Sequence, residues 1–232
     1  MDSPKHLGIV ACSSEGASLC YRTFCLEAGS AMGLYDHPEV SMHTHSLSRY
    51  MSAIHAGNWQ AVADLMLDSA EKLAKIGADL LICPDNTIHQ SMDLVEPKSP
   101  IPWLDIAQEV VAEANRQNYH SLAILGTKYL MEGPVYRHAA GRAGLTAIVP
   151  SSEDREHINN VIFQELVNGI TKPDSRTYFN AVMQKMKSLG CDAAVLGCTE
   201  IPLLIDPARA PLDTLDSTRI LARAALRCML GS

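Results

Sequence analysis

The sequence predicts an α/β protein made of two similar lobes, each built around a parallel β-sheet. Two observations carry this prediction. One segment occurs twice without a gap: residues 77–87 read GADLLICPDNT, and residues 190–200 read GCDAAVLGCTE. In addition, short apolar runs of Val, Ile, Leu and Ala alternate with longer stretches of helical period, which is typical of parallel sheets with right-handed crossovers.

The first lobe is expected over residues 1–105. It opens with a strand at residues 7–11, and a helix follows Gly16. A second helix is expected from about 59 to 76, because apolar side chains recur there at helical spacing. The apolar run at residues 80–83 then predicts a strand buried on both faces.

The second lobe is expected over residues 106–215. Its first expected element is a helix that ends at about residue 118. The pattern of the first lobe then restarts with a strand at residues 122–126. The remaining expected elements are helices at about 155–168 and 174–189, a strand at 193–196, and a last helix at 216–230 that packs back on the first lobe.

Composition limits the class of protein. The chain has 232 residues, of which 47% are hydrophobic and 19% charged, as in globular proteins. No apolar run approaches the roughly 20 residues of a membrane span, and the N-terminus lacks the pattern of a signal peptide. The net charge of -7, without clusters of Lys or Arg, argues against a nucleic-acid partner. We therefore expect a soluble cytoplasmic protein that binds a small molecule.

The seven cysteines show neither a C-x-x-C pair nor the spacing of a disulfide framework. Buried structural thiols are the expectation for most of them. We expect this in particular for Cys83, Cys191 and Cys228.

Cys198 stands in a different setting. Gly197 precedes it at the end of a predicted strand, Thr199 and Glu200 follow it, and Pro202 suits the first turn of a helix. The positive end of a helix dipole and unpaired backbone N–H groups stabilise a thiolate. Cys198 is therefore a candidate base at neutral pH.

Asp85 occupies the equivalent place in the first copy of the repeat. In open α/β sheets, ligands bind outside the carboxyl ends of the strands. Two symmetry-related lobes would aim Asp85 and Cys198 at one cleft from opposite sides. The repeat therefore predicts paired acid/base chemistry on the two faces of a small molecule.

Several polar residues near these strand ends are candidate ligand contacts. Asn86 and Thr87 follow Asp85 as Thr199 and Glu200 follow Cys198, and all four are candidate substrate contacts. Asn86 and Thr87 can cap a helix, bind a substrate carboxylate, or do both. Ser13 and Ser14 lie between the first strand and the next helix, where a cradle for an anion can form, and Thr127 holds the equivalent place in the second lobe. An ordinary turn is the alternative for these three.

No metal or cofactor is expected. His43 and His45 would share one face of a strand, but no nearby carboxylate or third His completes a site with recognisable spacing. The sequence also lacks the motifs G-x-x-x-x-G-K-[ST], G-x-G-x-x-G and G-x-S-x-G. This removes the simplest cases of nucleotide binding and serine hydrolysis.

The chain resembles the aspartate/glutamate racemase superfamily along nearly its whole length. The main pieces are NTIH at residues 86–89 and GCTE at residues 197–200. The aspartate racemase branch is the most similar, because Glu200 follows Cys-Thr where glutamate racemases usually carry His. Further pieces in the right order are residues 57–59, 125–127 with Met131 and Tyr136, 165–166 with Gly169, and 215–218.

The resemblance implies a homodimer of two-lobed subunits with pseudo-symmetric Rossmann-like lobes. It also implies a PLP-independent reaction in the cleft between the lobes, in which two cysteines face the substrate α-carbon. The second cysteine maps onto Cys198, but the first maps onto Asp85, which is the main departure. Arg49 lies in the region of the basic residues that bind the distal carboxylate, and His45 and Tyr136 are further candidate contacts to an amino acid or small carboxylate.

Three functions follow from the departure at Asp85. The first is an amino acid racemase or epimerase in which Cys198 and Asp85 exchange acid and base roles. A free carboxylate is a weaker base than a thiolate by about 4.6 pKa units, roughly 6 kcal/mol, although burial narrows that gap. The second is therefore a one-sided decarboxylase, lyase or isomerase that uses Cys198, and the third is a non-catalytic binding protein.

Overall fold

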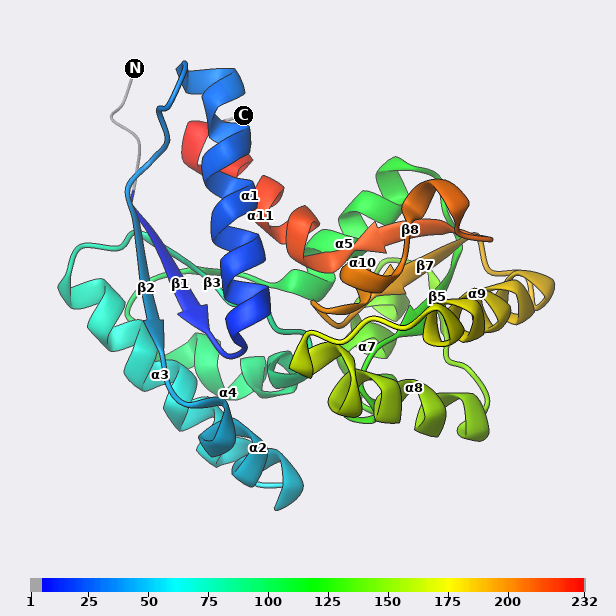
Figure 1. Ribbon diagram of the computed structural model, residues 1–232. Coiled ribbons are helices and arrows are strands. Elements are labelled where there is room, and N and C mark those ends of the chain that lie inside the picture. The colour runs from blue at the N-terminus through cyan, green and yellow to red at the C-terminus, as the bar shows by residue number, and fades with distance from the viewer. Residues whose placement is uncertain (1–5, 232) are drawn as a thin grey trace. The chain divides into compact units, whose positions relative to one another are not determined.

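The computed structural model describes residues 6–231, which form two compact units (Figure 1). The first contains the described residues up to Ile106 and those from Thr218 onward, and the second is Ala107–Ser217. Residues 1–5, on which the expectation of no signal peptide rests, lie outside the described residues, as does Ser232. Within the described part of the chain, none of the helices is long and apolar enough to cross a membrane.

Each unit contains a four-stranded sheet in which all strands are parallel, so the predicted α/β class is confirmed. In spatial order, the first sheet is β2 (Val40–Thr44), β1 (Leu7–Ala11), β3 (Leu80–Ile82) and β4 (Trp103–Leu104). The second is β6 (Thr146–Ile148), β5 (Ser121–Leu125), β7 (Ala193–Leu196) and β8 (Asp213–Asp216).

The two sheets have the same strand order, so β1 corresponds to β5 and β3 corresponds to β7. These four strands are the central ones, and their apolar runs are buried apart from Ser121 at the start of β5. The two copies of the repeat found in the sequence end just beyond β3 and β7. The predicted pseudo-symmetry is therefore confirmed at the level of topology.

Helices connect the strands within each unit. In the first unit they are α1 (Ser14–Met32), α2 (Leu47–His55), α3 (Trp59–Lys75), η1 (Thr87–Ser91), α4 (Met92–Val95), η2 (Glu96–Lys98) and α11 (Ser217–Leu230). In the second they are α5 (Ile106–Arg116), α6 (Lys128–Glu132), α7 (Val135–Arg142), α8 (Ser152–Gln164), η3 (Leu166–Asn168), α9 (Pro173–Ser188), α10 (Ile201–Leu204) and η4 (Pro207–Arg209).

The strands that sequence analysis did not predict lie at the edges of the sheets. The strands β4, β6 and β8 have only two to four residues and are mostly half-buried or exposed, so no continuous apolar run marks them. The helix expected at about 155–168 is wrong in its last turn. The α-helix ends at Gln164, and a 3₁₀ turn follows that stops at Gly169 with a φ of 72°.

The last helix, α11, packs beside α1 in the first unit (Figure 1). Phe24 and Ala28 of α1 belong to the same buried cluster as Leu221 and Ala225 of α11. At the edge of this contact, the Arg223 guanidinium donates to both carboxylate oxygens of Glu27, at 2.8 to 3.1 Å.

The Gly-x-Asp that opens each copy of the repeat has a structural role. Gly77 and Gly190 follow the helices α3 and α9 with φ of 94° and 88°, a conformation that glycine adopts without strain. The Asp79 carboxylate accepts the backbone N–H of His6 at 3.0 Å, and the Asp192 carboxylate accepts those of His120 and Ser121 at 2.6 and 2.9 Å. Each aspartate thus holds the start of the neighbouring central strand.

We expect Asp192→Ala to reduce the free energy of unfolding by about 1 kcal/mol, because two strand N–H groups lose their acceptor at a solvent-exposed site. These N–H groups lower the pKa of Asp192. The advantage of the wild type should therefore be complete above about pH 4 and should disappear as the pH falls through the lower pKa of the folded state.

Urea unfolding between pH 2 and 7 measures this difference. Asp36→Ala is the control, since it removes an exposed carboxylate that accepts no hydrogen bond among those observed. Equal stability of Asp192→Ala and wild type at pH 7 would contradict the structural role.

Candidate functional site

Asp85 and Cys198 lie just beyond the equivalent strands β3 and β7, each at the carboxyl end of its own sheet. Both side chains are half-buried, whereas the residues of the strands before them are buried. A parallel sheet presents the residues that follow its strands at one edge, which is where ligands bind in open α/β folds. The correspondence predicted from the repeat is therefore present in the two sheets.

The Asp85 carboxyl group begins the 3₁₀ turn η1. Its Oδ1 accepts the backbone N–H of Ile88 at 3.2 Å. The Asp85 backbone carbonyl accepts a hydrogen bond from Nδ1 of the buried His89 at 2.6 Å. The other ring nitrogen, Nε2, accepts the N–H of Ile106 at 3.4 Å, which places the His89 proton on Nδ1. The backbone at Asp85 is thus held firmly while one carboxylate oxygen, Oδ2, makes no hydrogen bond among those observed.

Cys83 is not the equivalent of the missing cysteine. It is fully buried, and burial, followed by the nearby Asp85 charge, raises the pKa of its thiol well above the ordinary value. A thiol in this state stays protonated at neutral pH and is a poor base. The structure is therefore consistent with the sequence alignment in which Asp85, and not Cys83, is the equivalent of Cys198.

Cys198 is hydrogen-bonded to a buried carboxyl group. Its Sγ donates to Oε2 of Glu200 at 2.9 Å, and the hydroxyl of Thr199 donates to the same oxygen at 2.9 Å. Thr199 and Glu200 are both buried, with 6% and 3% of their surface exposed. The three consecutive residues thus form one local unit in which Glu200 can accept the thiol proton.

The expected stabilisation of a Cys198 thiolate by a helix dipole and backbone N–H groups stays a prediction, and the helix concerned is short. The helix after Cys198, α10, has only four residues, so its aligned peptide dipoles are few. Pro202 does lie in the first turn, as predicted. The Glu200 carboxyl is a group that contacts the thiol directly.

Glycine at 197 is required by close packing. A Cβ there would lie 2.5 Å from Cδ2 of Leu130 and 3.0 Å from the carbonyl oxygen of Leu125. Gly126, at the end of the neighbouring strand, is restricted by the same Leu130 side chain at 2.8 Å. Tyr136, a predicted ligand contact, is buried and borders this point. The close packing of these two strand ends determines the backbone position from which the Cys198 side chain extends.

Ser13 and Thr127 occupy corresponding positions in the two units. Ser13 Oγ accepts the N–H of Gly16 at 3.2 Å at the start of α1, and Thr127 Oγ1 accepts that of Leu130 at 3.3 Å at the start of α6. Both residues therefore cap a helix that follows a central strand. Ser14 is exposed in the first turn of α1. Ligand binding by these three residues stays a prediction.

Asn86 and Thr87 continue from Asp85 into η1. Asn86 is buried, with 2% of its surface exposed, and Thr87 is half-buried. Asn86 occupies the capping position of η1 without a side-chain hydrogen bond to the turn. Of the two roles left open by the sequence, helix capping is therefore not what Asn86 does here, and contact with a ligand stays a prediction.

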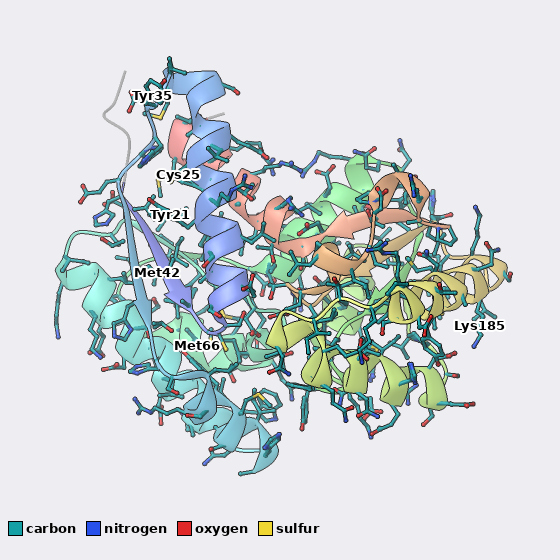
Figure 2. The ribbon with its side chains drawn as sticks, in the orientation of Figure 1. Tyr21, Cys25, Tyr35, Met42, Met66 and Lys185 are labelled. Carbon is teal, nitrogen blue, oxygen red and sulfur yellow. The ribbon has the colours of Figure 1, made fainter. Side chains whose placement is uncertain are left out.

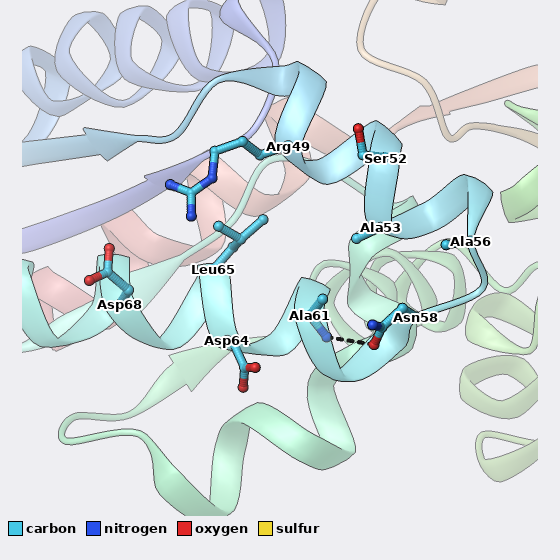
Figure 3. A pocket seen from close by; sticks show the side chains of 9 residues that line it. All are labelled: Arg49, Ser52, Ala53, Ala56, Asn58, Ala61, Asp64, Leu65 and Asp68. Carbon is cyan, nitrogen blue, oxygen red and sulfur yellow. Dashed lines mark hydrogen bonds between the residues drawn. The ribbon is translucent and has the colours of Figure 1, made fainter.

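Arg49 and His45 belong to a charged network on the first unit. Nδ1 of His45 lies 2.9 Å from a guanidinium nitrogen of Arg49, and its Nε2 lies 2.7 Å from the Asp68 carboxylate. Lys72 forms an ion pair with the same carboxylate at 2.5 Å. Figure 3 shows Arg49 and Asp68 along a groove of about 680 Å³ between α2 and α3. Sequence analysis predicted neither the contact between Arg49 and His45 nor the contact between His45 and Asp68.

The expectation that His43 and His45 lack a nearby carboxylate is wrong. Ligand atoms of His43, His45 and Asp68 lie within 4.8 Å of one another, a spacing that could hold a metal ion. However, Lys72 and Arg49 already place two positive charges on this group, and they oppose a divalent cation. The sequence pattern gave no signal for Asp68, because its contact is with His45, just after β2, more than 20 residues earlier in the chain.

The cysteines divide by exposure, and none of the seven forms a disulfide. The expectation of a buried structural thiol is wrong for Cys228, which is exposed on α11. Cys25 is half-buried one turn from Tyr21 on α1 (Figure 2), and burial raises the pKa of its thiol. The buried thiols are those of Cys12, Cys20, Cys83 and Cys191.

Comparison with known proteins identifies one family. Residues 13–225 match the family model described as Asp/Glu/Hydantoin racemase. The broad-specificity amino-acid racemase RacX of Bacillus subtilis (strain 168) is 21% identical over 211 residues, which cover 90% of this chain and 89% of RacX.

Two solved structures share the fold over nearly the full length. A Yersinia pestis protein considered an Asp/Glu racemase superimposes with a TM-score of 0.90 at 29% identity, covering 97% of this chain and 99% of that protein. An aspartate racemase homologue from Pyrococcus horikoshii OT3 gives a TM-score of 0.83 at 25% identity, with the same two coverages.

The packing at Gly197 gives a test of how the cysteine is positioned. We expect Gly197→Ala to destabilise the fold by about 1–3 kcal/mol, because the new methyl group overlaps a backbone carbonyl as well as Leu130. Thermal unfolding measures the loss. Gly141→Ala is the matched control, because a Cβ there meets nothing within 4 Å and alanine favours the helix α7. Similar melting temperatures for the two variants would contradict the close approach.

Proposed function

Because this chain belongs to the Asp/Glu/Hydantoin racemase family, we propose that it is a cofactor-independent amino acid racemase or epimerase in which Cys198 and Asp85 carry protons on opposite faces of the substrate α-carbon. Membership of this family supports an isomerase of the racemase type. The pairing of the two residues, and the substrate, are the parts that we propose.

The observation that carries the proposal is the matched position of Asp85 and Cys198. Each follows the third strand of the chain order in its own sheet, and the two sheets have the same topology. Racemisation requires one group to remove the α-proton and a second group to deliver a proton to the other face. Two titratable side chains at equivalent strand ends suit this requirement.

In the proposed reaction, the Cys198 thiolate takes the α-proton as the Cα–H bond breaks, and the electron pair of that bond is delocalised into the substrate carboxylate. The protonated Asp85 carboxyl then donates its proton to the opposite face, so that the thiol and the carboxylate remain. The reverse direction exchanges the two roles. Atoms and charge balance without any further reactant.

Glu200 supports the thiol in this scheme. Its carboxylate accepts the Sγ–H proton of Cys198 over 2.9 Å, so it can generate the thiolate before the substrate proton is removed. Thr199 donates to the same carboxylate oxygen and so orients it. Glu200 is then the proton acceptor for the Cys198 thiol, which is itself the base that removes the α-proton.

We further propose an acidic or related amino acid as the substrate. The broad specificity of RacX supports a site that is not restricted to one side chain. Asn86 and Thr87 on one strand end, and Ser13 and Thr127 at the caps of α1 and α6, are the candidate donors to its carboxylate. Arg49 is the candidate cation for a distal carboxylate, although it now bonds to His45.

A one-sided reaction is the second candidate, and the difference between the two strand ends favours it. Cys198 has a buried carboxyl partner in Glu200, whereas Asp85 accepts only a backbone N–H at its side chain among the bonds observed. An enzyme of this kind would use Cys198 on one face and release a stereospecific product. Decarboxylase, lyase and isomerase chemistry all fit.

Proton exchange in deuterated water separates these functions. Incubation of single enantiomers of acidic and neutral amino acids should give α-deuteration, which NMR measures, and loss of optical activity, which polarimetry measures. Cys198→Ser and Asp85→Asn should each slow racemisation by about 10²–10⁴-fold, the usual effect of a general acid or base.

Stereospecific deuteration without racemisation, or conversion to a different product, would establish the one-sided alternative. Thermal stabilisation by an amino acid, without exchange or any product, would instead support a non-catalytic binding protein. Glu156→Gln, a change in an exposed ion pair with Lys128, is the control for both active-site variants.

Glu200→Gln tests the proposed base separately. The amide keeps the size and an acceptor oxygen but cannot take the thiol proton, so we expect the exchange rate to fall by about 10–100-fold with little change in KM. Steady-state racemisation and the rate of Cys198 alkylation by iodoacetamide measure the effect. Unchanged rates in both assays would remove Glu200 from the mechanism.

A further inference from the structure

His89 is a buried histidine whose two ring nitrogens both make hydrogen bonds. The residue lies in the 3₁₀ turn η1 and has 4% of its surface exposed. Its Nδ1 is 2.6 Å from the backbone carbonyl oxygen of Asp85, and its Nε2 is 3.4 Å from the backbone nitrogen of Ile106. The proposed proton transfer does not use this side chain, although it contacts Asp85 directly.

The two partners determine the protonation state of the His89 ring. A carbonyl oxygen only accepts, so Nδ1 carries a proton, and a backbone N–H only donates, so Nε2 carries a lone pair. A doubly protonated ring would place an N–H group against the N–H of Ile106. Both nitrogens of the neutral ring are thus occupied by backbone groups, and neither is available to a substrate.

The bond to Asp85 is the stronger of the two. Its N–O distance of 2.6 Å lies below the usual range of about 2.7–3.2 Å for N–H···O bonds, whereas the contact with Ile106 is long at 3.4 Å. Ile106 is buried and is the first residue of α5, and the first N–H groups of a helix have no partner within it. The weaker bond therefore satisfies a helix end, while the stronger bond acts on a candidate site residue.

The Asp85 carbonyl determines the plane of the peptide group that joins Asp85 to Asn86. A trans peptide group is planar, so an oxygen that is held on one side directs the following N–H to the other side. No peptide bond among residues 6–231 is cis. At the side chain, Oδ1 of Asp85 accepts the N–H of Ile88 at 3.2 Å. Asp85 is therefore held at its backbone by His89 and at its carboxyl group by Ile88.

The second copy of the repeat has a proline where the first copy has His89. Extending the ungapped alignment by two residues places Pro202 at the equivalent position. Proline has no side-chain donor, and the carbonyl of Cys198 accepts the backbone N–H of Ile201 at 3.1 Å. The turn that follows β7 is thus built without a histidine. The side-chain bond belongs to the strand end that carries the carboxyl group.

We propose that His89 is a positioning residue for Asp85, which donates its Nδ1–H to the Asp85 carbonyl and so fixes the backbone from which the carboxyl group extends. A displacement of about 1 Å in a reacting group can reduce a rate by about 100-fold, so a fixed backbone matters for proton transfer. The catalytic consequence rests on the proposed function, in which Asp85 carries a proton. The hydrogen bond and its effect on the peptide group do not.

Two substitutions separate the two nitrogens of His89. The amide nitrogen of asparagine lies close to the place of Nδ1, so His89→Asn keeps a donor for Asp85 and loses the acceptor for Ile106. The amide oxygen of glutamine lies close to the place of Nε2, so His89→Gln keeps the acceptor and loses the donor. If the bond to Ile106 were the important one, His89→Asn would be the impaired variant. The positioning role predicts that His89→Gln is impaired.

The Asp85 carbonyl can be observed separately, because Asp85-Asn86 is the only Asp-Asn pair in the sequence. In protein labelled with ¹³C-carbonyl aspartate and ¹⁵N-asparagine, an HNCO spectrum contains one signal, from this peptide group. We expect the carbon signal to move upfield in His89→Gln, since the carbonyl loses a hydrogen bond, and to stay close to the wild-type position in His89→Asn. His138→Gln, the same change at an exposed histidine of α7, is the control.

The wild type gives a further test that needs no variant to fold. In protein labelled with ¹⁵N-histidine, the ring nitrogens of His89 should give one protonated and one unprotonated signal at neutral pH, with the proton on Nδ1. A proton on Nε2 would contradict the bond to the Asp85 carbonyl and overturn the proposal.

The enzymatic readout is α-proton exchange in deuterated water, at a temperature at which thermal unfolding shows both variants to be folded. We expect kcat in His89→Gln to fall by about 10–100-fold with little change in KM, because Asp85 acts only in the proton-transfer step. His89→Asn should recover most of this rate. A purely structural role would give equal rates in the two folded variants.

An Asp85 carbonyl signal that is the same in His89→Gln and wild type would overturn the proposal, whatever the activity. A moved signal with equal exchange rates in the two variants would overturn the catalytic consequence. Absence of exchange in the wild type, combined with a moved signal in His89→Gln, would reject the proposed racemase and still support the positioning of Asp85.

Discussion

The parallel pairing between the first and third strands of each sheet is the constraint on which the rest of the structure depends. It sets β3 against β1 and β7 against β5, and so decides where the chain leaves each sheet. Asp79 and Asp192 help to fix that register through hydrogen bonds to the start of β1 and β5. The residues that follow β3 and β7, Asp85 and Cys198 among them, then leave their sheets at defined positions, and local hydrogen bonds orient their side chains.

The central part of this arrangement could be predicted from the sequence because it is repeated and buried. Apolar runs mark β3 and β7, and the ungapped repeat gives Asp85 and Cys198 equivalent places in their own sheets. The peripheral part could not be predicted in the same way. The edge strand β8 reads Asp-Thr-Leu-Asp, and its single buried leucine carries no periodic signal.

The local chemistry was predictable to different degrees. Glu200 lies two residues from Cys198, so a contact between its carboxyl and the thiol is compatible with the sequence, although sequence analysis did not predict it. Pro207 gives a signal that α10 is short, because a residue that precedes proline avoids the helical conformation. In contrast, the contact of Asp68 with His45 depends on how α3 packs against the sheet, which no local pattern reports.

The close approach of Gly126 and Gly197 beneath Leu130 has a consequence for how this fold can vary. Two strand ends that touch through bare backbone leave no side chain that could be exchanged to adjust their separation. The side chain of Leu130, from the helix α6, is the one that limits both positions through its Cδ2. Changes in the placement of the sulfur are thus expected to arise from substitutions at 130, outside the cysteine's own segment.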